Sequence, residues 1–166
     1  MPRAALLPFM NPASLYHKLN DLLGTMGGWL RSPLLLLIRL YWGWQFFLSG
    51  KGKFLHLDRT TDYFASLDIP APKLNAILAG STECVFGLLL LAGLGGRVVP
   101  LPLIGLLTVA YVTSEQEAIH AIFSNPDKFV TADPFLFLFA AVIVLVFGPG
   151  KLSLDALFAK KTSSGE

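Results

Sequence analysis

Charged residues are scarce in this chain of 166 residues, since Asp, Glu, Lys and Arg together make up 14% of it. Soluble domains usually carry about a quarter charged residues, so this chain has few groups to cover a surface that faces water. The formal net charge of +2 is also far from the strongly basic balance of nucleic-acid-binding domains. We therefore expect contact with a lipid bilayer and no binding of nucleic acid.

Cysteine is nearly absent as well, with Cys84 as its one occurrence. A single cysteine excludes an intrachain disulfide and a CxxC redox pair. Any electron-transfer role would therefore require a bound cofactor or a partner protein. The sequence also shows no nucleophile–base constellation, no metal-binding cluster and no nucleotide-binding loop.

Apolar residues are abundant, at 54% of the chain, and they gather in runs. Four apolar stretches are separated by polar loops, at residues 33–48, 74–94, 98–113 and 134–147. A membrane-spanning helix needs about 20 mostly apolar residues, so only the second stretch is long enough without its flanking residues. A soluble bundle with buried helices is the rival interpretation, but runs without a polar face argue against it. The sequence predicts an all-α fold, a four-helix transmembrane bundle.

The N-terminal segment 1–32 has a different pattern. Apolar residues recur there at helical spacing, namely Leu15, Leu19, Leu22, Leu23, Met26 and Leu30. This pattern predicts an amphipathic helix that lies in the membrane interface before the first span. The domain organisation is then an interfacial segment at 1–32, a transmembrane domain at 33–158 and a polar tail at 159–166.

Positive charges indicate the orientation in the membrane. With four spans, the N-terminus, the second loop and the C-terminus share one side. That side carries Arg3, Lys18, Arg31, Arg97, Lys151, Lys160 and Lys161. The other side carries Lys51, Lys53, Arg59, Lys73 and Lys128, together with most of the acidic residues. The bias predicts a multi-pass protein with both termini in the cytoplasm.

Two ionisable residues interrupt the apolar stretches, Arg39 in the first and Glu83 in the second. A charge at the centre of a spanning helix costs about 2.5–3.5 kcal/mol on insertion scales, so such residues usually face the bundle and find partners. Because the two helices run antiparallel, we expect an Arg39–Glu83 ion pair. Two interpretations stay open: a polar functional site between helices, and a structural clasp that holds two helices together.

Other polar positions are weaker candidates. Gln45 and Thr108 would bridge helices, and Trp42 and Tyr111 would pack or lie at the interface. Glu117 and His120 have the E-x-x-H spacing of di-iron bundles, but a second copy and further carboxylates are missing, so we expect no metal. His120 is expected at the membrane edge, as a proton-handling group or as an ordinary interfacial side chain.

Several of these residues occur in an order that resembles the DoxX family. Residues 38–54, IRLYWGWQFFLSGKGKF, are similar to a family pattern of arginine, glycine, phenylalanine, glycine and lysine, with Lys51 or Lys53 as the lysine. Glu83 stands where the family has its intramembrane glutamate, and His120 where many members have a histidine. The small-residue exit of the second span and the ending FGPGKLSLD also match: Gly93, Gly95, Gly96, Arg97, Gly148, Pro149, Gly150, Ser153, Leu154 and Asp155. The resemblance covers about residues 33–158.

The resemblance implies a four-span protein of the bacterial inner membrane that serves as a subunit of a quinone-linked redox assembly. Its site would include Arg39, Glu83 and His120. Quinone is the implied cofactor, and the partner is a redox protein or a second copy of the chain. The residues expected to line a ligand are Gln45, Lys53, Trp42 and Tyr111. A non-enzymatic scaffold or chaperone and a small-solute transporter are the alternatives, because kinship of fold does not transfer a reaction.

Overall fold

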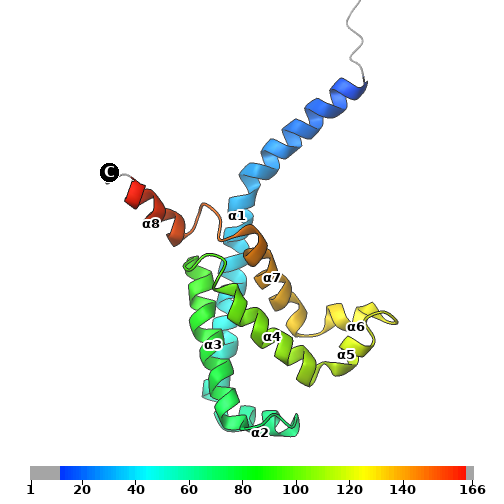
Figure 1. The fold of residues 1–166 in the computed structure, drawn as a ribbon, viewed down its shortest axis with the longest axis vertical. Helices are drawn as coiled ribbons and strands as arrows, with labels where there is room; N and C mark the ends of the chain where they lie inside the picture. Colours follow the sequence, from blue (N-terminus) through cyan, green and yellow to red (C-terminus); the bar gives the residue numbers. More distant parts are fainter. Residues whose placement is uncertain (1–11, 164–166) are drawn as a thin grey trace, which may run out of the picture.

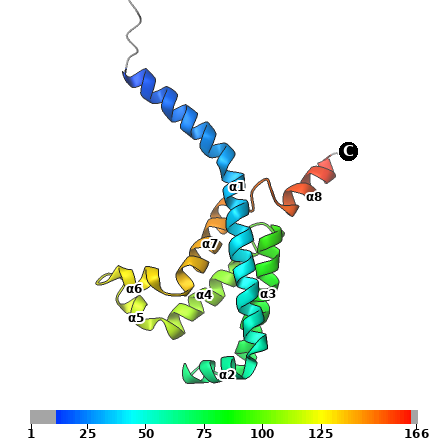
Figure 2. The ribbon, with the colours of Figure 1, turned by 180° about the vertical axis from the view of Figure 1, so that it is seen from behind.

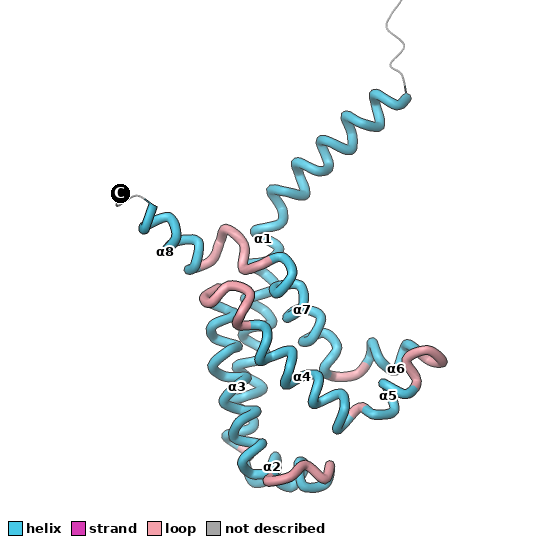
Figure 3. The backbone as a smooth tube through the Cα atoms, in the orientation of Figure 1, coloured by secondary structure: helices cyan, strands magenta, loops and turns pink. Residues whose placement is uncertain are grey.

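The chain is helical wherever its structure is described. The computed structural model describes residues 12–163, and these residues form helices and connecting loops without a β-strand (Figure 3). The predicted all-α fold class is confirmed.

Four helices build the bundle: α1 (Pro12–Leu55), α3 (Pro72–Ala92), α4 (Pro100–Ser114) and α7 (Pro134–Phe147). α1 packs along α3, α4 packs along α7, and α3–α4 and α1–α7 contacts join the two pairs (Figure 1). The buried core lies between them, and its members are Phe46, Leu90, Val99, Leu103, Leu107 and Val144.

Four short helices lie at the ends of the bundle: α2 (Leu57–Ser66), α5 (Gln116–His120), α6 (Pro126–Thr131) and α8 (Leu154–Ser163). α2, α5 and α6 lie at one end, which we call the α2 end. α8 and the first half of α1 lie at the other, which we call the α8 end (Figures 1 and 2). The two ends of the described chain therefore lie on the same side of the bundle, as an even number of bundle helices requires.

Proline and glycine set where these helices start and stop. α3, α4 and α7 each have proline in their first turn, where its fixed φ suits a helix and its missing N–H costs nothing. α3 ends at Ala92 and is capped by Gly93, whose φ of +69° places it in the left-handed region. Glycine adopts that conformation without a steric penalty. The helix boundaries thus follow from local sequence chemistry.

The expected interfacial helix and the first span form one continuous helix. α1 runs without interruption past Pro33, and its first half leaves the bundle at an angle (Figure 1). A proline inside a helix removes one hydrogen bond and bends the axis. In the bundle, α1 also continues to Leu55, well past the predicted end at Leu48. α8 likewise continues into the segment predicted as a polar tail.

The outer surface of the bundle is apolar. Large side chains face outward on all four bundle helices, for example Leu37, Leu88, Val109 and Leu136. By length and composition α3 is the single helix within residues 12–163 that is long and apolar enough to cross a membrane. α4 and α7 are apolar but shorter, with 15 and 14 residues. That all four helices cross the bilayer stays a prediction.

Candidate functional site

A buried ion pair joins α1 to α3. The Nζ of Lys53 lies 2.7 Å from Oε2 of Glu83, and it also donates a hydrogen bond to the hydroxyl of Ser49 at 3.0 Å. The Glu83 side chain is 7% exposed, whereas Lys53 keeps 23% exposure. The carboxylate is therefore withdrawn from solvent, and the ammonium is its counter-ion.

Glycines place these two residues together. A Cβ added to Gly50 would lie 2.6 Å from the carbonyl oxygen of Gly80, and a Cβ added to Gly43 would lie 2.7 Å from the backbone nitrogen of Leu91. The backbones of α1 and α3 thus approach as closely as small residues permit. This register sets Ser49 and Lys53 of α1 beside Glu83 of α3.

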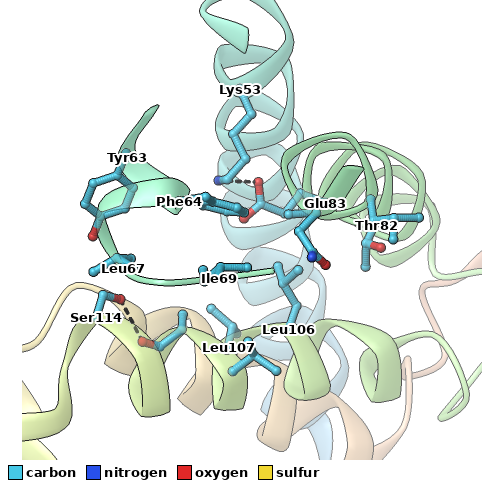
Figure 4. A pocket seen from close by; sticks show the side chains of 15 residues that line it. Lys53, Tyr63, Phe64, Leu67, Ile69, Thr82, Glu83, Leu106, Leu107 and Ser114 are labelled. Carbon is cyan, nitrogen blue, oxygen red and sulfur yellow. Dashed lines mark hydrogen bonds and ion pairs between the residues drawn. The ribbon is translucent and has the colours of Figure 1, made fainter. Parts of the chain in front are cut away.

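The ion pair forms part of the wall of a cavity of about 330 Å³ between α2, α3 and α4. Glu83 and Lys53 meet on one side of it, Leu106 and Leu107 of α4 line another, and Tyr63 and Phe64 of α2 close a third (Figure 4). Ligand pockets in proteins are typically about 300–1,000 Å³, mostly apolar, with a few placed polar groups. This cavity fits that description.

Two other polar side chains in the wall are already engaged. The Asn75 amide donates to the carbonyl of Pro70 at 2.6 Å, and the Ser114 hydroxyl donates to the carbonyl of Ala110 at 2.7 Å. An ammonium donor beside a carboxylate acceptor, set in apolar walls, can bind a small ligand that has carbonyl oxygens and can exchange a proton with it. The Lys53–Glu83 pair is therefore the chemical centre of the site.

Arg39 does not pair with Glu83, so the predicted Arg39–Glu83 ion pair is wrong. Arg39 lies at the α8 end, fully buried, where its Nη2 donates to the carbonyl of Leu152. Its Nη1 abuts Gly93, the residue that ends α3. The carboxylate of Asp155 is close enough to favour the charged form, while Nε and Nη1 have no hydrogen-bond partner among the described residues.

The error has a simple geometric cause. The apolar run 33–48 placed Arg39 near the middle of the first span. In the bundle, however, the helix continues to Leu55, so Arg39 lies near one end of the contact with α3 and Lys53 near the other. Glu83 is therefore closer to the lysine that follows the apolar run than to the arginine within it.

The loops at the α8 end hold each other through backbone hydrogen bonds. The Asp155 carboxylate accepts the N–H groups of Gly95 at 3.1 Å and Gly96 at 2.6 Å, and both glycines have positive φ. The Asp155 N–H in turn donates to the carbonyl of Gly93 at 3.2 Å. Successive N–H groups of this kind form a concave nest for an anion. The glycine-rich exit of α3 and the ending of the FGPGKLSLD motif are thus two halves of one structural clasp.

Glu117 and His120, the residues of the E-x-x-H pair, do not come together in a common site. His120 is exposed, and Glu117 instead pairs with Lys128 of α6. The hydrogen bond from Lys128, reinforced by its charge, holds the pKa of the Glu117 carboxyl below its ordinary value. No group of three or more His, Cys, Asp or Glu residues that could hold a metal ion occurs within residues 12–163.

The other predicted lining residues are not in the cavity. Trp42 packs edge-on against Phe137 of α7. Tyr111 is buried, and its hydroxyl donates to the carbonyl of Phe129 at 2.9 Å, which fastens α6 to α4. Gln45 is half-buried, away from the cavity wall. Thr108 bonds back to Ile104 in its own helix, so it bridges no helices.

Sequence reasoning missed the wall that α2 provides. Residues 57–69 were expected to be a polar loop, yet Phe64, Leu67 and Ile69 close the cavity. The half-buried positions Leu57, Thr61, Phe64 and Leu67 recur three or four residues apart, which is the spacing of an amphipathic helix. That spacing could have predicted from the sequence that α2 is a helix with one apolar face.

The sequence is similar to a family of known proteins and to proteins of two bacteria. The chain matches the family model of DoxX over residues 34–116. It is 30% identical over 135 residues to an uncharacterized protein of Haemophilus influenzae, and the match covers 76% of this chain and 83% of that protein. It is also 30% identical over 144 residues to an uncharacterized membrane protein of Mycobacterium tuberculosis, with coverage of 80% and 85%. No solved structure matches the chain.

The structure is a helical bundle with an apolar outer surface and a buried ion pair. This is the architecture of a helical membrane protein. The chain belongs to the DoxX family. The family resemblance drawn from the motifs is confirmed.

Proposed function

We propose that this protein is the membrane subunit of a quinone-linked redox assembly and that its cavity beside Lys53 and Glu83 holds the quinone head group. The ion pair in the wall of an apolar cavity of about 330 Å³ carries the proposal. Because electrons must come from elsewhere, the proposal includes a partner redox protein.

The residues present fit a quinone ring. Leu106, Leu107 and Phe64 supply apolar and aromatic contacts for a flat ring. Lys53 offers ammonium hydrogens to a ring carbonyl oxygen, and Glu83 keeps that ammonium in place. When bound, the quinone would supply two-electron, two-proton chemistry. The chain would hold and orient the ring, exclude bulk water and place the Glu83 carboxylate where it can accept and return a proton.

We further propose a multi-pass arrangement in the bacterial inner membrane with the α8 end in the cytoplasm. α3 has the length to span, and α1 continues past its apolar run through Lys51 and Lys53 to Leu55. Lys and Arg are more numerous at the α8 end than at the α2 end, which is the bias that the positive-inside rule associates with a cytoplasmic side. The cavity lies toward the α2 end, so its protons would exchange with the opposite side of the membrane.

The proposal is tested by measuring quinone in the purified protein. The chain is extracted in a mild detergent, and isoprenoid quinones are quantified by chromatography and mass spectrometry. Quinone near one molecule per binding site is expected for the parent protein, and Glu83→Gln is expected to lose most of it. Glu117→Gln is the matched control, because it makes the same substitution in an exposed ion pair outside the cavity.

Quinone at the level of bulk lipid, unchanged by Glu83→Gln, would exclude the quinone site. If a stable protein partner then co-purified equally with both variants, the non-enzymatic scaffold would be the better account. Transport would instead be indicated by a solute flux in proteoliposomes that Glu83→Gln abolishes.

A further inference from the structure

A second hollow lies at the α8 end, far from the cavity beside Glu83. Where the first half of α1 leaves the bundle (Figure 1), a groove of about 550 Å³ separates α1 from the loop before α8. Its lining residues are Thr25, Gly28, Trp29, Ser32, Lys151 and Leu152.

Both walls of this groove are fixed in place. Arg31 donates to the carbonyl of Phe147 at 2.7 Å and lies over the Phe147 ring, which ties α1 to the end of α7. On the facing wall, the Lys151 N–H donates to the Ser32 hydroxyl at 3.3 Å, and the Leu152 carbonyl accepts from Arg39. The opening is therefore a built feature of the junction between α1 and the 148–153 loop.

The lining combines a cation with apolar surface. Lys151 supplies the one charge among the lining residues, while Trp29, at 80% exposure, and the exposed Leu152 supply apolar contact. A tryptophan beside a lysine is a combination typical of the boundary between hydrocarbon and head groups. The groove thus has a place for an anion next to a place for an acyl chain.

The charge of this end favours an anionic occupant. Its basic residues in the described chain are Lys18, Arg31, Arg39, Arg97, Lys151, Lys160 and Lys161, and its acidic residues are Asp21 and Asp155. Asp155 faces both the fully buried Arg39 and the N–H groups of Gly95 and Gly96, so the charges of Asp155 and Arg39 offset each other. Arg3, counted earlier on this side, lies outside the described residues.

Helices with exposed apolar side chains flank the groove. The first half of α1 exposes Leu22, Leu23 and Met26, and α8 exposes Leu157 and Phe158. Both helices diverge from the bundle at this end (Figure 2). Apolar faces of this kind rest at the level of lipid head groups, which sets the groove at the depth of phospholipid phosphates.

We propose that this groove binds the head group of an anionic phospholipid, with Lys151 contacting the phosphate and Trp29 and Leu152 contacting the glycerol and upper acyl chain. The site does not depend on the proposed quinone role, since it shares no residue with the cavity beside Glu83. It requires only that the protein resides in a membrane.

Trp29 provides a reporter for the test. Substituting Trp42→Phe and Trp44→Phe leaves Trp29 as the sole tryptophan, and the full chain is placed in vesicles with a fixed fraction of brominated lipid. Brominated phosphatidylglycerol is expected to quench Trp29 more than brominated phosphatidylcholine with the same acyl chains. One basic residue at a membrane surface corresponds to about a fivefold preference.

Lys151→Gln is expected to remove that preference, and Lys51→Gln, an exposed lysine at the α2 end, is expected to keep it. Equal quenching by the two lipids, or a preference that survives Lys151→Gln, would overturn the proposal. So would a preference abolished by millimolar glycerol 3-phosphate, which would indicate a free phosphate ligand. Shielding of Trp29 from both lipids would mean that protein covers the groove, and it would also overturn the proposal.

A second measurement needs no substitution of tryptophan. Native mass spectrometry of the parent chain in neutral detergent, with equal amounts of phosphatidylglycerol and phosphatidylcholine, is expected to show retained phosphatidylglycerol. Lys151→Gln should lower that retention several-fold. Equal retention of the two lipids by the parent chain would contradict a built anionic site.

Discussion

Arg39 and Glu83, the two ionisable residues within the apolar stretches, lie at different levels of the α1–α3 contact and have different partners. Glu83 pairs with Lys53, and Arg39 donates to the carbonyl of Leu152. Lys53 follows Arg39 by fourteen residues in one helix, which corresponds to about 21 Å along its axis. The bundle therefore has a polar site toward the α2 end and a structural clasp at the α8 end.

The Lys53–Glu83 pair is expected to be energetically coupled. Lys53→Met alone leaves a buried carboxylate without its counter-ion, and removing one partner of a buried pair costs about 3–5 kcal/mol. Because Lys53 is partly exposed, we expect about 2 kcal/mol here. The double variant Lys53→Met, Glu83→Gln should lose less than the sum of the single variants, as equilibrium unfolding in mixed micelles would show. Additive losses would mean that the two side chains do not interact.

The glycines between α1 and α3 are expected to tolerate no side chain. A Cβ on Gly87 would lie 2.8 Å from the Cβ of Phe46, so Gly87→Ala must push the helices apart. We expect a loss of about 1–3 kcal/mol, as for other overpacked cores, measured as a lower Tm in detergent. Gly105→Ala is the control, since nothing lies within 4 Å of its added Cβ. It should leave the Tm unchanged or raise it, because alanine favours a helix.

The clasp at the α8 end depends on both oxygens of Asp155. Asp155→Asn keeps the shape but replaces one acceptor with an NH₂ donor, so one of the two glycine N–H groups loses its partner. The expected cost is about 1–3 kcal/mol, with faster hydrogen–deuterium exchange at Gly95 and Gly96. Asp133→Asn, at a helix start without a side-chain cap, should leave that exchange unchanged. Equal protection in Asp155→Asn would contradict the clasp.

Lys128 is expected to control the ionisation of Glu117. Lys128→Met removes the hydrogen bond and the charge that lower the pKa of the Glu117 carboxyl, so that pKa should rise toward its ordinary value of about 4.3. A carboxyl with a lowered pKa stabilises the fold above its unfolded-state pKa, and this contribution is lost as the pH falls through the folded-state pKa. Both side chains are exposed, so the Tm at pH 7 should barely change. A pKa unchanged in carboxyl-detected NMR would contradict the pairing.

Much of this architecture could be predicted from the apolar runs and from the prolines and glycines at the helix ends. Proline in the first turns of α3, α4 and α7 and glycine after α3 delimit helices by local chemistry that does not depend on tertiary contacts. Gly80 and Gly87 lie on one face of α3 and let α1 approach closely, and small residues at helical spacing are a sequence feature typical of such contacts. The burial of Glu83 could also be predicted, because the residues around it in the sequence are apolar.

The partner of Glu83 could not be predicted, because it depends on helix register. Hydropathy ended the first span at Leu48, whereas packing against α3 extends the helix to Leu55. That extension brings Lys53 to Glu83 and leaves Arg39 at the other end. The role of α2 in closing the cavity was missed for a related reason. Its polar composition is typical of a loop, and only the packing of Phe64 and Leu67 in the structure shows that it forms a wall.

Photoaffinity labelling with an azido-quinone, followed by peptide mapping, tests the cavity beside Lys53 and Glu83 most directly. The account predicts labelling on peptides that cover residues 63–83 and 106–114, which contain most of the residues that line the cavity. It also predicts competition by unlabelled quinone and strong reduction in Glu83→Gln. Labelling spread over the outward-facing surface of all four helices, insensitive to competitor and to Glu83→Gln, would contradict it.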